Sequence, residues 1–148
     1  MNDRDWMMLA MAEAEKAMAE GEIPVGAVIV RDGTAIAAAH NRREADGDAT
    51  AHAEVLAIRE AGRVLGGWHL HGCTLYVTLE PCPMCAGAVI NARLDRVVFG
   101  AYDRKAGSFG SLIDLSAYPY NHRPQIDGGV CEEEAKALLT RCFRRLRR

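Results

Sequence analysis

The sequence lacks the features of a membrane protein or of a disulfide-bonded secreted protein. No apolar run approaches the ~20 residues that a membrane-spanning helix needs. The first residues, Met1 to Asp5, lack the basic segment with which a secretory signal begins. The five cysteines are an odd number, and two of them stand three apart, so a disulfide scaffold is disfavoured. We therefore expect a cytoplasmic protein that has no contact with a membrane.

Internal repeats, low-complexity tracts and a strong net charge are also absent. The 148 residues correspond to one domain, residues 1–148, which is long enough to bury a core. The formal net charge of −2 conceals a basic C-terminal end that holds Arg141, Arg144, Arg145, Arg147 and Arg148. A basic end is compatible with a polyanionic partner but does not establish one.

The order of helical and extended patterns predicts an α/β protein. We expect strands over residues 25–30, 34–39, 74–79, 96–100 and 125–127, and helices over 3–20, 51–61, 81–92 and from 132 onward. The Asp-Gly turn at residues 32–33 predicts a hairpin. Alternation of strand and helix after residue 74 predicts parallel strands with helices on both faces of the sheet. Residues 102–124 are long for a loop, which indicates a function or a short helix.

Two expected helix starts carry residues that can do chemistry. Pro81 suits the first position of a helix, where its missing N–H costs nothing. Cys82 and Cys85 would then share one face of the first turn, where the helix dipole favours thiolates. Thr50 is the expected cap of the helix that begins near residue 51. By itself, the Cys-x-x-Cys pair fits a redox pair or half of a structural zinc site equally well.

His52 and Glu54 change the interpretation of the cysteine pair. Residues two apart on a helix point to nearly opposite sides, so both can serve one site only at the helix terminus. One imidazole and two thiolates are three good zinc ligands, and they leave the fourth tetrahedral position for water. Zinc would lower the pKa of that water toward about 7, and Glu54 would carry protons. A lone His52 would more often be a solvated side chain.

The remaining cysteines have no comparable spacing. We expect Cys73, Cys131 and Cys142 to be buried apolar fillers or free thiols.

The two motifs together form a known signature. The pattern H-x-E followed by P-C-x-x-C marks zinc-dependent nucleobase deaminases, of which the tRNA adenosine deaminases are a described example. Over nearly its whole length the chain resembles the bacterial tRNA-specific adenosine deaminases. The segments that carry the resemblance are Trp6-Met7, residues 23–28, Asn41-Arg42, residues 50–54, 76–88, 96–101, 110–112 and 121–123, and the helix end at Phe143.

The resemblance implies a fold, a reaction and a set of partners. The fold is the three-layer α/β/α cytidine deaminase-like fold, with a five-stranded mixed sheet whose last strands are parallel. The reaction is hydrolytic deamination of the wobble adenosine of a tRNA anticodon to inosine, with release of ammonia. The implied cofactor is one zinc ion per subunit. The implied assembly is a homodimer that binds the tRNA anticodon loop.

The resemblance also implies roles for individual residues. His52, Cys82 and Cys85 would bind zinc, and Glu54 would be the catalytic proton carrier. Asn41 would hydrogen-bond the flipped base, in a pocket lined by substrate-binding residues that include Ile23, Pro24 and Ala53. The residues expected where the anticodon loop passes are Asp103, Lys105, Asn121, His122 and Arg123.

Two other functions remain open at this point. A deaminase of free guanine or cytosine would share the zinc signature. A non-catalytic, zinc-bearing RNA-binding subunit is a different class of protein, but a structural zinc site has no need of Glu54. Without the family pattern, we would expect Asn41 to be a turn residue. We would also expect ordinary solvated charges at Arg42, Arg43, Arg104 and Lys105.

Overall fold

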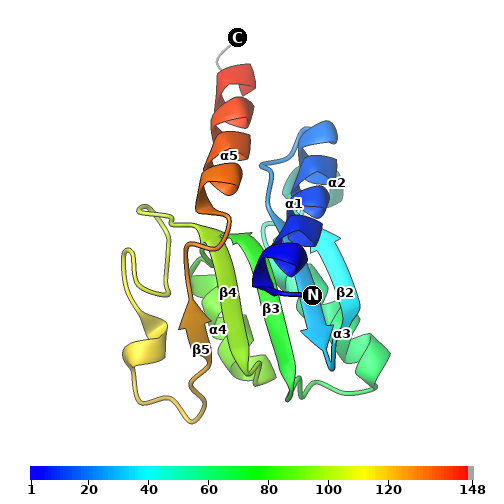
Figure 1. Cartoon of the computed structure of the whole chain (residues 1–148), viewed down its shortest axis with the longest axis vertical. Coiled ribbons are helices and arrows are strands. Elements are labelled where there is room, and N and C mark those ends of the chain that lie inside the picture. Colours follow the sequence, from blue (N-terminus) through cyan, green and yellow to red (C-terminus); the bar gives the residue numbers. More distant parts are fainter. Residues whose placement is uncertain (147–148) are drawn as a thin grey trace.

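A five-stranded mixed sheet of order β2-β1-β3-β4-β5 lies at the centre of this computed structural model, which describes residues 1–146 (Figure 1). β1 (Gly26–Arg31) pairs antiparallel with β2 (Thr34–His40) and with β3 (Cys73–Leu79). β4 (Arg96–Ala101) and β5 (Gln125–Asp127) continue the sheet in parallel with β3. The predicted hairpin and the predicted parallel last strands are therefore confirmed.

Helices cover both faces of the sheet and give the predicted three layers. α1 (Asp3–Ala19) and α5 (Glu132–Leu146) pack on one face, while α3 (Ala53–Leu65) and α4 (Pro83–Ala92) pack on the other (Figure 1). Two short helices, α2 (Arg43–Asp46) and the 3-10 helix η1 (Leu115–Ala117), lie in the connections. None of the helices among residues 1–146 has the length and hydropathy needed to cross a membrane.

The three central strands, β1, β3 and β4, are apolar because both of their faces are buried. Ala27 and Ile29 of β1 face α3 and α4, whereas Val28 and Val30 face α1. A strand covered on both sides has no solvated face, so its sequence reads as a continuous apolar run rather than an alternating one.

Two predicted helix starts are wrong. The start of α4 is Pro83 rather than Pro81, and Cys82 is its N-cap, with extended backbone angles of φ −73° and ψ 175°. A residue that precedes proline is sterically pushed out of the helical region, which explains why Cys82 stays outside the helix. Likewise His52, not Thr50, is the N-cap of α3. The backbone N–H and hydroxyl of Thr50 donate instead to Asp48 Oδ1.

The short helix α2 falls in a stretch that the sequence presents as a polar loop. Its second and third backbone N–H groups, those of Glu44 and Ala45, donate to the buried carboxylate of Glu22 at 3.0 and 2.8 Å. Because this partner is more than twenty residues away in the chain, local sequence patterns give no sign of it.

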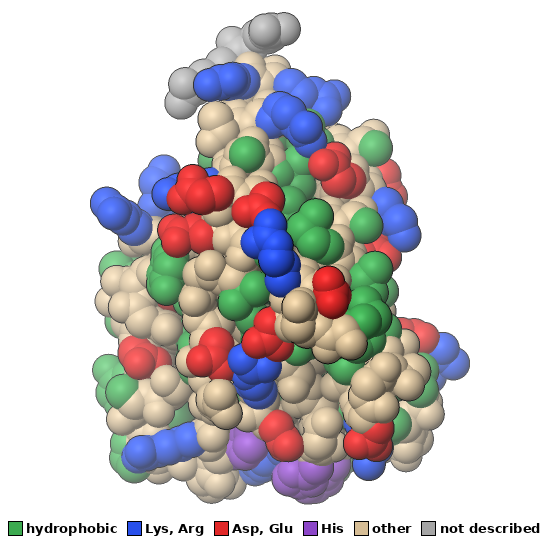
Figure 2. All heavy atoms as spheres, viewed as in Figure 1, with side chains coloured by type: hydrophobic (Ala, Val, Ile, Leu, Met, Phe, Trp, Pro, Cys, Tyr) green, Lys and Arg blue, Asp and Glu red, His purple; other side chains and the backbone are tan. Residues whose placement is uncertain are grey.

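The basic C-terminal end is visible at the top of Figure 2, where Lys and Arg side chains gather around the end of α5. Arg141 is partly neutralised, since it donates to Glu15 of α1 at 3.0 Å. Arg147 and Arg148 lie outside the described residues.

A polar network joins α1 to three strands of the sheet. Asp3, the first residue of α1, accepts two hydrogen bonds from Arg96 of β4 at 2.9 and 2.7 Å and one from the Tyr76 hydroxyl of β3 at 2.8 Å. Arg96 also donates to Asp127 of β5 at 2.8 Å. Hydrogen bonding to Arg96 holds the pKa of Asp3 below its usual value, and burial together with Asp3 raises the pKa of Tyr76 to about 12.

We expect the substitution Asp3→Asn to lower the free energy of unfolding at pH 7 by about 1 kcal/mol, because it removes a charge-assisted pair that is only partly shielded from solvent. The pKa of Asp3 is lower in the folded chain than its ordinary value of 3.8. The stabilisation is therefore fully present above pH 3.8, and it is lost as the pH falls through the pKa that Asp3 has in the folded chain. Urea unfolding across this pH range measures the difference.

The matched control is Asp95→Asn, which changes an exposed carboxylate in the turn before β4. Equal losses for both variants, or a loss for Asp3→Asn that persists at the lowest pH at which the chain folds, would contradict this role of Asp3.

Candidate active site

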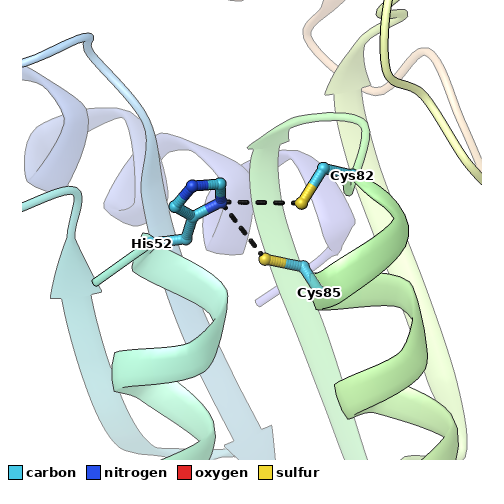
Figure 3. Close-up of side chains that lie close together, drawn as sticks. All are labelled: His52, Cys82 and Cys85. Atoms are coloured by element: carbon cyan, nitrogen blue, oxygen red, sulfur yellow. Dashed lines mark hydrogen bonds between the residues drawn. The ribbon is translucent and has the colours of Figure 1, made fainter. Parts of the chain in front are cut away.

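Three potential metal ligands converge where α3 and α4 begin (Figure 3). His52 Nδ1 lies 3.6 Å from Cys82 Sγ and 3.5 Å from Cys85 Sγ. Ligand atoms of one tetrahedral zinc ion lie roughly 3.5–3.8 Å apart, given bond lengths of about 2.0 Å to nitrogen and 2.3 Å to sulfur. The observed separations fit zinc, and no second group of three such ligands occurs within residues 1–146. The cofactor expected from the sequence is therefore supported by the geometry.

The capping geometry explains why these side chains meet. His52 and Cys82 both hold extended backbone conformations as the N-cap residues of α3 and α4, and Cys85 follows in the first turn of α4. The positive ends of the two helices therefore point at one site, where they stabilise negative charge. The predicted convergence near residues 52 and 82 is confirmed, although Cys82 precedes the helix instead of sharing its first turn.

The two thiols do not ionise alike. Hydrogen bonds from Cys85 and His52 lower the pKa of Cys82 to about 4, while the same hydrogen bond to Cys82 and burial raise the pKa of Cys85. The thiolate of Cys82 disfavours ionisation of its neighbour Cys85, because like charges repel at this short distance. Binding of zinc would release the second proton.

Glu54 stands beside this cluster and is almost completely buried, with 3% of its surface exposed. Burial raises the pKa of its carboxyl to about 7, because desolvation disfavours the charged form. It does not belong to the group of metal ligands. A carboxyl group held next to the ligands without binding the metal suits proton transfer.

A pocket of about 220 Å³ opens over the cluster. His52, Glu54 and Cys82 line it, while Cys85 is buried below. The predicted substrate-binding residues that also line it are Ile23, Asn41, Ala53 and Asp103. Pro24 and Lys105 are absent from its lining: Pro24 is buried next to Ile23, and Lys105 is exposed two residues beyond Asp103.

Asn41 is held in place by its own chain. Its Oδ1 accepts the backbone N–H of Arg43 at 3.2 Å, and its Nδ2 donates to the carbonyl of Ile23 at 3.2 Å. The turn role and the pocket role of Asn41 therefore coincide, because the same hydrogen bonds that shape the turn orient its amide. One N–H and one lone pair of the amide remain for a ligand.

Asn121, His122 and Arg123 are not brought to the pocket of the same chain. His122 Nε2 lies 2.6 Å from the carbonyl of Leu94, in the turn just before β4 begins. The pocket lies at the other end of this strand, about 20 Å away for six residues at about 3.3 Å each. Their contact with RNA stays a prediction.

Three residues at or next to the pocket are not predicted as site residues from the sequence. Glu22 and Glu80 are buried carboxylates with 2% exposure, and Arg43 lines the pocket from α2. Glutamate is ordinarily exposed, so a sequence gives no reason to place these carboxylates inside. A signal was available only for Glu80, which lies between a strand and the cysteine motif.

Residues 1–101 match the family model of the cytidine and deoxycytidylate deaminase zinc-binding region. The match covers more than half of the chain and places it in the class of zinc-dependent deaminases. The chain is also 51% identical over 147 residues to the tRNA-specific adenosine deaminase of Bacillus subtilis. The aligned residues cover 99% of this chain and 91% of that protein. The chain belongs to the family of tRNA-specific adenosine deaminases.

Solved structures agree with this assignment. A tRNA:A34 deaminase studied for A-to-I editing at the wobble position of transfer RNA superposes with a TM-score of 0.89 at 43% identity, covering 91% of this chain and 99% of that one. Guanine deaminase from Bacillus subtilis superposes less closely, with a TM-score of 0.68 at 37% identity, covering 95% and 94%. The cytidine deaminase-like fold is thereby confirmed.

We expect the purified chain to hold one zinc ion and the variant Cys82→Ala to hold much less, because a tetrahedral site loses one of three protein ligands. Glu54→Gln should keep its zinc, since Glu54 is not a ligand. Elemental analysis by mass spectrometry measures the zinc content. The control Cys142→Ala removes a buried thiol of α5 and should leave the zinc content unchanged. Zinc retained in full by Cys82→Ala would rule out this ligand set.

Proposed function

We propose that this chain deaminates the wobble adenosine of a tRNA anticodon to inosine, with release of ammonia. The observation that carries the proposal is the buried carboxyl of Glu54 beside the His52, Cys82 and Cys85 cluster, at the base of a pocket. The activity of the relatives named above supports the choice of substrate.

The protein supplies proton transfer and positioning. Zinc, when bound, supplies Lewis-acid activation of water. Glu54 takes a proton from the attacking water and delivers it to a ring nitrogen as the new C–O bond forms at C6 of adenine. The same carboxylate then takes the proton of the new C6 hydroxyl and transfers it to the departing amine, so that the C6 carbonyl forms, the C–N bond breaks and ammonia leaves. One water is consumed for each ammonia released.

The pocket walls select and orient the base. Asn41 lines the pocket with one N–H and one lone pair of its amide left for a ligand, and Ile23 and Ala53 supply apolar walls. A base in a loop must leave its stack to enter such a pocket, which costs a few kcal/mol and is least costly where the RNA is single-stranded. An anticodon loop meets this condition.

Contacts with the rest of the RNA are also proposals. Asp103 lines the pocket and Lys105 is exposed on the same loop, so both are placed to contact nucleotides that flank the target. Asn121, His122 and Arg123 lie too far from this pocket to share its ligand within one chain. They would contribute if RNA reaches across a subunit boundary. A tRNA substrate and a thiol-rich metal site both suit the cytoplasm.

We infer that the chain forms a homodimer. An apolar hollow between α3 and α4 is lined by Ile58, Trp68, Ala88 and Ala92, and Trp68 is 61% exposed. Exposed tryptophan is enriched in protein–protein interfaces, so Trp68 beside this hollow suits burial between two subunits. Multi-angle light scattering should give a mass of about twice 16.1 kDa. A concentration-independent monomer mass would contradict the dimer.

The decisive assay compares substrates. We expect an anticodon stem-loop RNA with adenosine at the wobble position to yield inosine and ammonia in equal amounts, whereas free guanine and free cytosine yield no ammonia. Ammonia from guanine or cytosine alone would favour a free-base deaminase. Binding of RNA without ammonia from any of the three would favour a non-catalytic RNA-binding subunit.

Two variants on one helix serve as controls for this assay. Glu54→Gln should lower the rate of inosine formation by roughly 10²–10⁴-fold, the usual contribution of a general acid–base group. Glu60→Gln changes an exposed carboxylate of α3 that is paired with Arg63, and it should leave the rate unchanged. Near-normal turnover by Glu54→Gln would remove Glu54 from the mechanism.

A further inference from the structure

Glu80 is a buried carboxylate that has no role in the reaction described above. It follows the last residue of β3 and precedes Pro81 and Cys82, and only 2% of its surface is exposed. Its backbone N–H donates to the carbonyl of Ala101 at 2.9 Å, which extends the pairing of β3 with β4 by one residue. The main chain of Glu80 is therefore fixed by the sheet.

The side chain of Glu80 accepts four hydrogen bonds from one loop. Oε1 accepts the backbone N–H of Asp103 at 3.1 Å and the hydroxyl of Ser111. Oε2 accepts the backbone N–H of Phe109 at 3.1 Å and that of Ser111 at 3.0 Å. An ionised carboxylate has only acceptor sites, and this loop presents only donors to it. The loop over residues 103–111 therefore wraps around one fixed anion.

Gly107 shows how closely the loop approaches the carboxylate. A Cβ atom at this position would lie 2.4 Å from Glu80 Cδ and 2.3 Å from the carbonyl oxygen of Asp103. Both distances are far below van der Waals contact, so only glycine fits here. The loop is thus shaped to pass over the Glu80 side chain.

The same loop forms one wall of the pocket. Asp103 and Ala106 line the pocket together with Glu80 itself. The Asp103 carboxylate accepts the backbone N–H groups of Lys105 and Ala106, so the turn that follows depends on where Asp103 is held. The hydrogen bond from Asp103 to Glu80 is the link between this wall and the sheet.

We propose that Glu80 is a positioning residue for RNA binding, which holds the loop over residues 103–111 in the conformation that closes the pocket around the flipped nucleotide. Its carboxylate acts through Asp103 and Ala106 and does not touch the reacting atoms. This inference rests on the proposed function, because it assigns the loop to the RNA substrate.

Glu80→Gln tests the proposal with little change of shape. An amide places an NH₂ donor against backbone N–H donors, so part of the loop loses its acceptor. We expect the KM for the anticodon stem-loop to rise about 10–100-fold, with kcat within about threefold and zinc content unchanged. Amide hydrogen exchange should become faster at Asp103, Phe109 and Ser111 and stay unchanged in α4. A residue that served only global stability would accelerate exchange throughout and would not separate KM from kcat.

Two further variants keep the test decisive. Ser111→Ala removes one donor and leaves the carboxylate intact, so it should raise KM about threefold even if Glu80→Gln fails to fold. Asp114→Asn is the matched control, because this carboxylate lies farther along the loop and accepts hydrogen bonds from Ser116. It should leave KM unchanged.

The possible outcomes separate the two hypotheses. An unaltered chain that does not deaminate the stem-loop defeats the proposed function. An active chain whose KM is unaffected by Glu80→Gln and Ser111→Ala defeats only the role of Glu80. A fall in kcat with KM unchanged, or a loss of zinc, would also overturn that role.

Discussion

The structure depends on the meeting of two helix N-termini at one edge of the sheet. Each helix begins with a capping residue that is also a potential metal ligand, His52 for α3 and Cys82 for α4. Pro83 enforces the second cap, because the residue before a proline is disfavoured in the helical region. The ligand geometry therefore follows from local backbone constraints, and the sheet has only to bring the two starts together.

Three buried glutamates belong to the segments that form this site. One of them, Glu54, lies beside the ligands and is buried, and its pKa is raised to about 7. Glu22 and Glu80 are equally buried but accept backbone N–H groups, Glu22 from α2 and Glu80 from the loop over residues 103–111. A buried carboxylate is tolerated where donors satisfy it or where it can hold a proton. Hydrogen-bond donors satisfy Glu22 and Glu80, whereas Glu54 can hold a proton for the reaction.

The comparison with the sequence shows where local patterns suffice. Five strands, the hairpin and the four long helices could be predicted, because their apolar runs and caps are signals within a few residues. The start of α4 is misplaced because two prolines stand close together, and the start of α3 because Thr50 bonds to Asp48 instead of capping the helix. α2 was missed because its N-terminus is capped by Glu22 from a distant segment. The wall of the pocket formed by residues 103–111 was read only as a long loop, since its anchor is Glu80.

The sequence by itself determined the donor set. His52, Cys82, Cys85 and Glu54 are identified by residue type and spacing, and those are properties of the chain that no fold can change. Only the tertiary structure decided which other residues share their pocket. It placed Asn41 and Asp103 at the site, and it placed Asn121, His122 and Arg123 at the opposite end of β4. The physical reason is that the distance between remote segments depends on sheet order and on buried hydrogen bonds, neither of which leaves a local pattern in the sequence.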